Sequence, residues 1–220
     1  MTTSRRSDIQ PFIAMDVLAR ANALEAAGKS VLHLEVGEPG STAPQCVLDA
    51  ARAALDSGKL GYTEALGRMS LRQRIARHYG QSYGVELDPA RVVVTTGSSA
   101  GFTLAFLALF DAGARVGVAE PGYPAYRNIL KSLDLVPLAL PAGPATRWQI
   151  TPEQVTAEHM GEGCQGLLVA SPANPTGTML SPSALGDLVK LCDERGIAFI
   201  SDEIYHGLTY EMEAASALQT

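Results

Sequence analysis

Four short stretches of the sequence place polar or aromatic side chains directly after an apolar run that is typical of a buried strand. In chain order they contain Gly97-Ser98-Ser99, Tyr123, Asn174 and Asp202. Ligands of parallel α/β sheets bind where the carboxyl ends of the strands meet, so these four places are expected to lie along one rim. The sequence therefore predicts one ligand site that is assembled from four separate parts of the chain.

The Gly97-Ser98-Ser99 stretch has the chemistry of an anion site. It lies between a predicted strand and a predicted helix, where free backbone N–H groups, two hydroxyls and the positive end of the helix favour a phosphate. A tight strand-to-helix turn with a serine cap is the alternative interpretation. The common nucleotide motifs are excluded, because no GxGxxG follows a strand and Gly28-Lys29-Ser30 has Ala23 where a P-loop needs its first glycine.

The other residues of the rim fit an aromatic ring that contains a nitrogen. A carboxylate at the dry end of a strand, as predicted for Asp202, needs a cationic or N–H partner, and a protonated ring nitrogen supplies one. The Asn174 amide and the Tyr205 phenol can both hydrogen-bond a ring oxygen, and Tyr123 offers a flat face for stacking. Together with a phosphate site, these groups describe pyridoxal phosphate.

The elements that must position these residues alternate between strands and helices. Strands are predicted at 92–95, 115–119, 135–140, 166–170 and 198–201. Helices are predicted at 7–27, 44–55 and 71–83, after each of the first two strands, from Thr151 onward, and at 181–195. This alternation predicts an α/β fold with a mostly parallel sheet that is covered by helices on both faces.

The composition limits the classes of protein to which the chain can belong. Apolar types make up 46% and charged types 18% of the 220 residues, which excludes intrinsic disorder. The 17 Lys+Arg against 23 Asp+Glu argue against a nucleic-acid partner. Three distant cysteines, Cys46, Cys164 and Cys192, predict neither a metal site nor a disulfide framework. Without a targeting or membrane-spanning segment, a cytoplasmic protein is expected.

Six stretches of the chain also form a pattern in a fixed order. They are Gly37-Glu38-Pro39, Tyr62 with Gly67 and Leu71-Arg72, Thr96-Gly97-Ser98-Ser99, Pro121-Gly122-Tyr123-Pro124, Ser-Pro-Ala-Asn-Pro-Thr-Gly at 171–177, and Ser201-Asp202-Glu203-Ile204-Tyr205. In this order they resemble the fold-type I, pyridoxal phosphate-dependent aminotransferases of class I/II, the aspartate aminotransferase superfamily. The resemblance implies a three-layer αβα large domain of the pyridoxal phosphate-dependent transferase fold, plus an N-terminal segment of a smaller domain.

The resemblance implies a role for each residue of the rim. Asp202 and Tyr205 are the catalytic residues that it assigns to this chain. Asp202 would keep the ring nitrogen of the cofactor protonated, while Asn174 and Tyr205 would bind the phenolic oxygen of the ring. Tyr123 would stack on the ring, and Gly97-Ser98-Ser99 would hold the phosphate.

Two residues outside the rim are implicated by the resemblance alone. Tyr62 would reach the phosphate of the cofactor in a neighbouring subunit, which implies a homodimer with shared active sites. Gly37 would meet the substrate carboxylate through its backbone. A core or loop aromatic remains the alternative for Tyr62, and a plain turn glycine remains the alternative for Gly37.

The lysine that such an enzyme requires is missing from its expected setting. In the family it forms the covalent link to the cofactor, moves a proton, and follows the Asp-Glu-Ile-Tyr segment. The lysines of this chain are Lys29, Lys59, Lys131 and Lys190, and none has that setting. The arginine that would bind the substrate α-carboxylate is also missing.

These absences predict how the chain is organised. We expect residues 1–45 to be an N-terminal arm and the start of the small domain, and residues 46–220 to be the large domain, incomplete at its C-terminus. The 220 residues alone are expected to be inactive and part of a longer polypeptide, with a naturally short protein as the alternative.

The expected activity of the complete enzyme is exchange of an amino group between an L-amino acid and a 2-oxo acid. Two alternatives remain. A carbon–sulfur β-lyase uses the same fold and the same motifs, and a truncated pyridoxal phosphate-fold module would bind without catalysis.

Overall fold

The computed structural model describes residues 2–37, 40–58, 60–156, 163–210 and 212–220. They form two compact units, Met1–Ile9 with Met69–Thr220 and Gln10–Arg68. The Gln10–Arg68 unit contains the helices α1 (Ile13–Ala26) and α2 (Gln45–Asp56), close to where helices were predicted. The division into a small-domain segment at 1–45 and a large domain at 46–220 stays a prediction.

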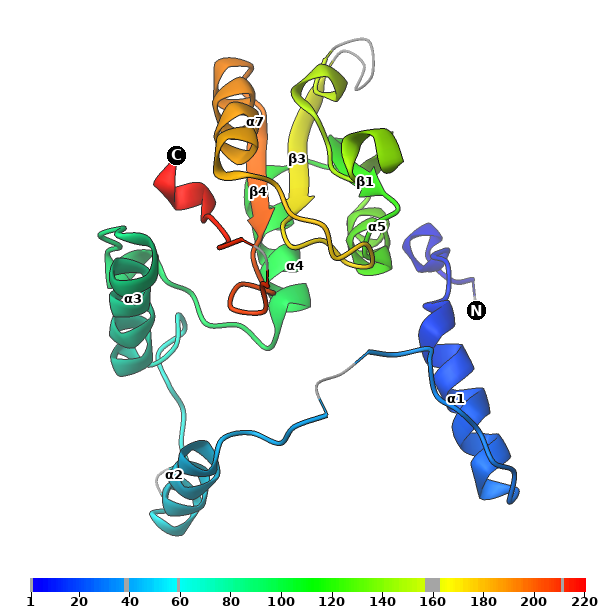
Figure 1. Ribbon diagram of the computed structural model, residues 1–220, viewed down its shortest axis with the longest axis vertical. Coiled ribbons are helices and arrows are strands. Elements are labelled where there is room, and N and C mark those ends of the chain that lie inside the picture. The colour runs from blue at the N-terminus through cyan, green and yellow to red at the C-terminus, as the bar shows by residue number, and fades with distance from the viewer. Residues whose placement is uncertain (1, 38–39, 59, 157–162, 211) are drawn as a thin grey trace. The chain divides into compact units, whose positions relative to one another are not determined.

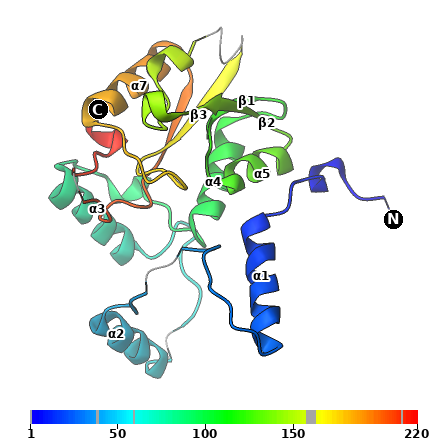
Figure 2. The same cartoon turned by 45° about the vertical axis from the view of Figure 1, so that its right-hand side comes forward.

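The larger unit contains a four-stranded sheet in which all neighbouring strands are parallel. Its strands are β1 (Arg115–Glu120), β2 (Val136–Pro141), β3 (Cys164–Ala170) and β4 (Ala198–Asp202). Their spatial order is β2-β1-β3-β4, and Figure 2 shows β1, β2 and β3 side by side. Four of the predicted strands are thereby confirmed, because long apolar runs between turn residues are typical of strands buried on both faces.

Helices cover both faces of this sheet, as predicted. The larger unit contains α3 (Met69–Tyr83), α4 (Ser98–Leu109), α5 (Pro124–Ser132) and α7 (Pro182–Glu194), with short 3-10 turns at Arg5–Ser7, Pro89–Arg91, Pro144–Thr146, Pro152–Gln154 and Ala217–Gln219. On β3, Leu168 packs into a core with α4 and α5, whereas Leu167 and Val169 pack into a second core with α7 (Figure 1). The fold is therefore three-layered, and it is the α/β fold expected from the sequence.

Two predictions of secondary structure need correction. The predicted strand at 92–95 is not a strand: Val93 and Val94 are 48% and 37% exposed, and the described backbone offers the segment no paired neighbour. Instead, Arg72 Nε donates a hydrogen bond of 2.8 Å to the Val92 carbonyl. The helix predicted from Thr151 is a single 3-10 turn as far as it is described, since residues 157–162 lie outside the described residues.

The packing between the end of α4 and β3 predicts how a methyl group added at Gly166 changes the stability of the protein. A Cβ added to Gly166 would lie 2.3 Å from Cζ of the buried Phe110 ring, so Gly166→Ala is expected to lower the free energy of unfolding by about 1–3 kcal/mol. Gly186→Ala is the matched control, because its Cβ would lie 3.5 Å from Thr220 Cγ2, an ordinary contact. Urea unfolding of both variants tests this; equal midpoints for the two would contradict the packing argument.

Candidate active site

Asp202 is the last residue of β4 and lies at the carboxyl end of the parallel sheet. Its side chain is buried, and both carboxylate oxygens are engaged by the protein: Oδ1 accepts from the backbone N–H of Ile204 at 3.1 Å, and Oδ2 accepts from the Tyr126 hydroxyl. A carboxylate oxygen has two lone pairs, so each oxygen can accept one further hydrogen bond. Asp202 is therefore a fixed and buried acceptor.

Tyr126, which the sequence analysis did not single out, holds this carboxylate from α5. Burial, followed by the hydrogen bond to Asp202, raises the pKa of the Tyr126 hydroxyl above its ordinary value, so the hydroxyl remains a donor. Its ring contacts those of Tyr123 and Phe102 edge-on, with centroid distances of 5.4 and 5.1 Å. Tyr126 follows Tyr123, the N-cap residue of α5, by three residues, and this spacing is the sequence signal that would have identified it.

Asn174 and Tyr205 meet although they lie in different loops. The Asn174 side-chain amide donates a hydrogen bond of 3.1 Å to the Tyr205 hydroxyl. Asn174 lies in the loop after β3 and Tyr205 lies in the turn after β4. The backbone N–H of Ser171 donates to the Asp202 carbonyl at 3.2 Å, so the two loops begin side by side. The structure thus brings Asn174, Asp202 and Tyr205 to one end of the sheet, as predicted.

The loop at 171–180 is held in shape by several hydrogen bonds of its own. Ser171 Oγ accepts from the backbone N–H of Leu180 at 3.0 Å, and the Ala173 N–H donates to the Thr178 carbonyl at 2.9 Å. From outside the loop, the buried Gln149 donates through Nε2 to the same carbonyl at 2.8 Å. Asn174 is therefore presented by a closed loop.

The Gly97-Ser98-Ser99 stretch forms the N-terminus of α4. Gly97 caps the helix with φ 86° and ψ 166°, and its carbonyl accepts from the Thr95 hydroxyl at 2.8 Å. The first backbone N–H groups of a helix have no partner within the helix, which makes this end favourable for an anion. Phe102 lies one turn after Ser98 and contacts the Tyr126 ring. Because the Tyr126 hydroxyl holds Asp202, these two aromatic residues join the start of α4 to the Asp202 carboxylate.

Comparison with known proteins identifies the family of this chain. The family model of aminotransferases of class I and II matches residues 29–220. The chain belongs to the class I and II aminotransferase family. This membership confirms the resemblance that the sequence motifs suggested.

Individual members of the family are similar over nearly all of this aminotransferase chain. A valine–pyruvate aminotransferase of Mycobacterium tuberculosis is 47% identical over 206 residues, which are 94% of this chain and 53% of that protein. The crystal structure of an aminotransferase from the same organism matches with a TM-score of 0.92 at 43% identity, over 98% of this chain and 55% of that chain. The Thermus thermophilus aspartate aminotransferase with maleate matches with a TM-score of 0.93 at 32% identity, over 100% of this chain and 57% of that chain. The chain spans about half the length of the curated relatives that it matches.

Two residues predicted for the aminotransferase site belong to the other compact unit. Tyr62 and Gly37 belong to the Gln10–Arg68 unit, so their contacts with cofactor and substrate stay predictions. Residues 38–39 of the Gly-Glu-Pro stretch are outside the described residues.

The lysines of the larger unit lie on helices. Lys131 is in α5, and the exposed Lys190 is in α7, 3.9 Å from Glu194. Lys29 belongs to the other unit, and Lys59 is outside the described residues. Within the described ranges, no lysine donates to Asp202, Asn174 or Tyr205 in the hydrogen bonds given above.

In the described part of the chain, no three His, Cys, Asp or Glu side chains come together as possible metal ligands. No helix among those residues combines the length and apolar character needed to cross a membrane.

Proposed function

We propose that this chain is the cofactor-binding part of a pyridoxal phosphate-dependent aminotransferase, which exchanges an amino group between an L-amino acid and a 2-oxo acid. The observation that carries the proposal is the buried Asp202 carboxylate, fixed by Tyr126 at the carboxyl end of a parallel sheet, beside the Asn174–Tyr205 pair. Family membership supports it, and so do the names of the relatives.

The residues present fit the cofactor group by group. Pyridoxal phosphate has a ring nitrogen, a ring oxygen and a phosphate, and each has a complementary partner here. Asp202 can accept a hydrogen bond from a protonated nitrogen, and the Asn174–Tyr205 pair offers N–H and O–H groups to an oxygen. The N-terminus of α4 at Gly97-Ser98-Ser99 suits the phosphate.

Bound pyridoxal phosphate supplies an electron sink that makes the α-proton of an amino acid removable. The residues of this chain would prepare that chemistry. Asp202 would hold a proton on the ring nitrogen, and Tyr126 would keep the carboxylate in place. Asn174 and Tyr205 would orient the ring, against which Tyr123 would stack.

Two residues of the smaller unit, Tyr62 and Gly37, are proposed to contact a second subunit and the substrate. Tyr62 has a fully exposed side chain, which supports its proposed reach into the active site of a second subunit and hence a homodimer with shared sites. Gly37 is proposed to meet the carboxylate of the amino acid or 2-oxo acid. A cytoplasmic location also stays a prediction.

The proposal is tested first by binding and then by turnover. The 220-residue chain is expected to bind pyridoxal phosphate, measured by ultrafiltration and absorbance, and to show no turnover. The form of the enzyme that contains the catalytic lysine is expected to make alanine from valine and pyruvate, the pair named for the relative at 47% identity. Release of ammonia and pyruvate from a sulfur-containing amino acid without an oxo-acid acceptor would instead support the β-lyase, and absence of cofactor binding would contradict both.

A further inference from the structure

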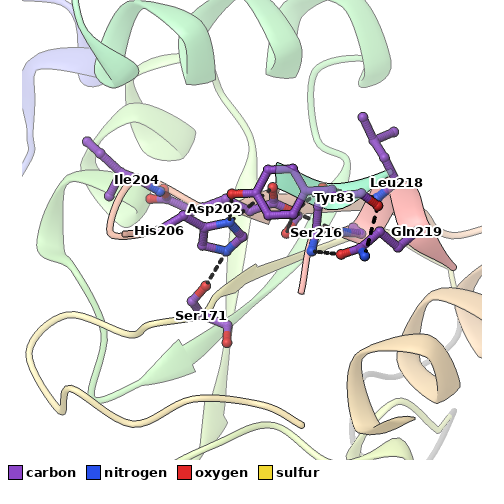
Figure 3. Close-up of polar contacts among 11 residues, drawn as sticks. Tyr83, Ser171, Asp202, Ile204, His206, Ser216, Leu218 and Gln219 are labelled. Carbon is purple, nitrogen blue, oxygen red and sulfur yellow. Dashed lines mark hydrogen bonds and ion pairs between the residues drawn. The ribbon is translucent and has the colours of Figure 1, made fainter. Parts of the chain in front are cut away.

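His206 contacts two other parts of the chain through its two ring nitrogens. Nδ1 lies 2.7 Å from the Tyr83 hydroxyl at the end of α3, and Nε2 lies 3.1 Å from the Ser171 carbonyl after β3 (Figure 3). Nδ1 also lies 3.8 Å from Oε2 of Glu203 in the same turn, and the His206 side chain is only 8% exposed. The proposed function gives no role to this imidazole. The imidazole nevertheless joins the turn after β4 to the end of α3 and to the loop after β3.

The chemistry of its partners determines where the protons lie. A carbonyl oxygen only accepts, so Nε2 must carry a proton and donate to Ser171. In the neutral ring, Nδ1 then accepts from Tyr83, whose pKa is raised by burial and further by the Glu203 carboxylate, so that its hydroxyl keeps its proton. A protonated ring would donate from Nδ1 to the same hydroxyl, which can also accept. Both contacts therefore persist in either protonation state of His206.

The segments that His206 joins are those that carry Asn174 and Tyr205. Ser171 opens the closed loop that contains Asn174, and His206 directly follows Tyr205 in the turn after β4. The backbone N–H of His206 donates to the Glu203 carbonyl at 3.0 Å and closes this turn. The His206–Ser171 contact and the Asn174–Tyr205 contact are thus two links between the same two loops.

The same Glu203 carboxylate also anchors the base of the turn through its other oxygen. Glu203 Oε1 accepts from the Ser201 and Ser216 hydroxyls at 2.9 and 3.2 Å, and from the Ala217 N–H at 2.7 Å. These contacts tie the start of the turn to the last residues of the chain. They do not reach the 171–180 loop, so beyond the backbone bond from Ser171 to the Asp202 carbonyl, the spacing between the two loops depends on the two side-chain links described above.

We propose that His206 is a positioning residue that sets the spacing between the loop carrying Asn174 and the turn carrying Tyr205. With this spacing fixed, the two side chains can present their donors to a single oxygen of the ligand. This inference rests on the proposed function for the identity of that ligand. His206 itself touches neither cofactor nor substrate.

The cofactor-free chain provides the first test, by NMR of the Asn174 side-chain amide. In His206→Ala, these signals are expected to move toward those of a free amide. In His206→Gln they are expected to stay near the wild-type values, because the Gln amide can still donate to the Ser171 carbonyl. His33→Gln is the matched control, since His33 belongs to the Gln10–Arg68 unit and hydrogen-bonds Glu35 within it. Unchanged Asn174 signals in a folded His206→Ala protein would overturn the proposal.

A second pair of variants tests the positioning role of His206 if His206→Ala does not fold. His206→Leu fills the buried position with an apolar side chain that cannot donate to the Ser171 carbonyl, whereas the Gln amide of His206→Gln still can. A shift of the Asn174 amide in His206→Leu, with wild-type signals in His206→Gln, is expected. Identical Asn174 signals in these two variants would overturn the proposal.

Titration with pyridoxal phosphate separates this inference from the proposed function. Loss of a buried hydrogen-bond partner is expected to weaken binding about tenfold in His206→Ala, with most of the affinity recovered in His206→Gln. Equal affinities of wild type and His206→Ala would show that His206 does not position the pair. If the wild-type chain binds no cofactor, the proposed function fails, while the NMR comparison still decides the positioning role.

Discussion

Replacement of Asp202 by alanine is expected to lower the turnover of the lysine-containing enzyme by several orders of magnitude. The side chain is buried at the end of β4, where its carboxylate would stabilise a proton on the ring nitrogen of the cofactor. Without that proton the ring withdraws electrons poorly, and the α-proton of the substrate is held more tightly. Single-turnover kinetics with valine measure the effect directly.

Asp202→Asn removes the negative charge of the side chain but keeps its size, so it separates the effect of the charge from the effect of the packing. The single oxygen of an Asn side chain can still accept from the Ile204 N–H, and its NH2 group can donate to the Tyr126 hydroxyl, which can also accept, so the protein is expected to fold with nearly unchanged thermal stability. It carries no negative charge and is expected to be almost as slow as the alanine variant. Near-normal turnover in Asp202→Asn would rule out the proposed role of Asp202 and, with it, the proposed chemistry of the site.

Gly97→Ala is expected to weaken binding of pyridoxal phosphate by roughly tenfold to a hundredfold. Gly97 has φ 86° and ψ 166°, a backbone conformation that is essentially restricted to glycine and costs other residues on the order of 1–3 kcal/mol. An alanine would relieve this strain by turning the backbone away, which would misdirect the N–H groups at the start of α4. Fluorescence titration of the chain with pyridoxal phosphate measures the change in affinity.

The matched control lies on the same helix. A Cβ added to Gly101 would lie 3.5 Å from Thr95 Oγ1, which is ordinary contact, and an alanine inside a helix gains about 0.5–1 kcal/mol over glycine. Gly101→Ala should therefore bind the cofactor as the wild type does. Equal affinities of Gly97→Ala and wild type would mean that the phosphate does not bind at the N-terminus of α4.

The strands of the sheet were predictable because their signal is local. The apolar runs that became β1 to β4 are bounded by turn residues, and each lies within one or two residues of its predicted limits. The segment at 92–95 has the same local signal, Val-Val-Val-Thr, but it is not a strand. Pairing requires a neighbouring strand, and no local pattern can reveal whether one is present.

The sequence analysis singled out residues whose side chains suggest a ligand, but it did not single out the residues that contact and support them in the fold. Asp202, Asn174 and Tyr205 have side chains whose types suggest a ligand. Tyr126 and His206 act through partners 76 and 35 residues away in the sequence, and the only nearby signal is the spacing of Tyr126 from Tyr123. Such supporting contacts depend on the assembled fold, which explains why the motif-based analysis missed them.

The aromatic packing around Tyr126 has a consequence for which ligands the site accepts. One ring touches Phe102 on α4, and its hydroxyl holds Asp202 at the end of β4. The proposed phosphate-binding end and the proposed nitrogen-binding end of the site are thus joined by close-packed aromatic rings. We expect such a site to select by molecular length, because a ligand would have to carry its phosphate and its ring nitrogen at one fixed separation. Discrimination among cofactor analogues would be built into the larger unit, independently of the segments that choose the amino acid.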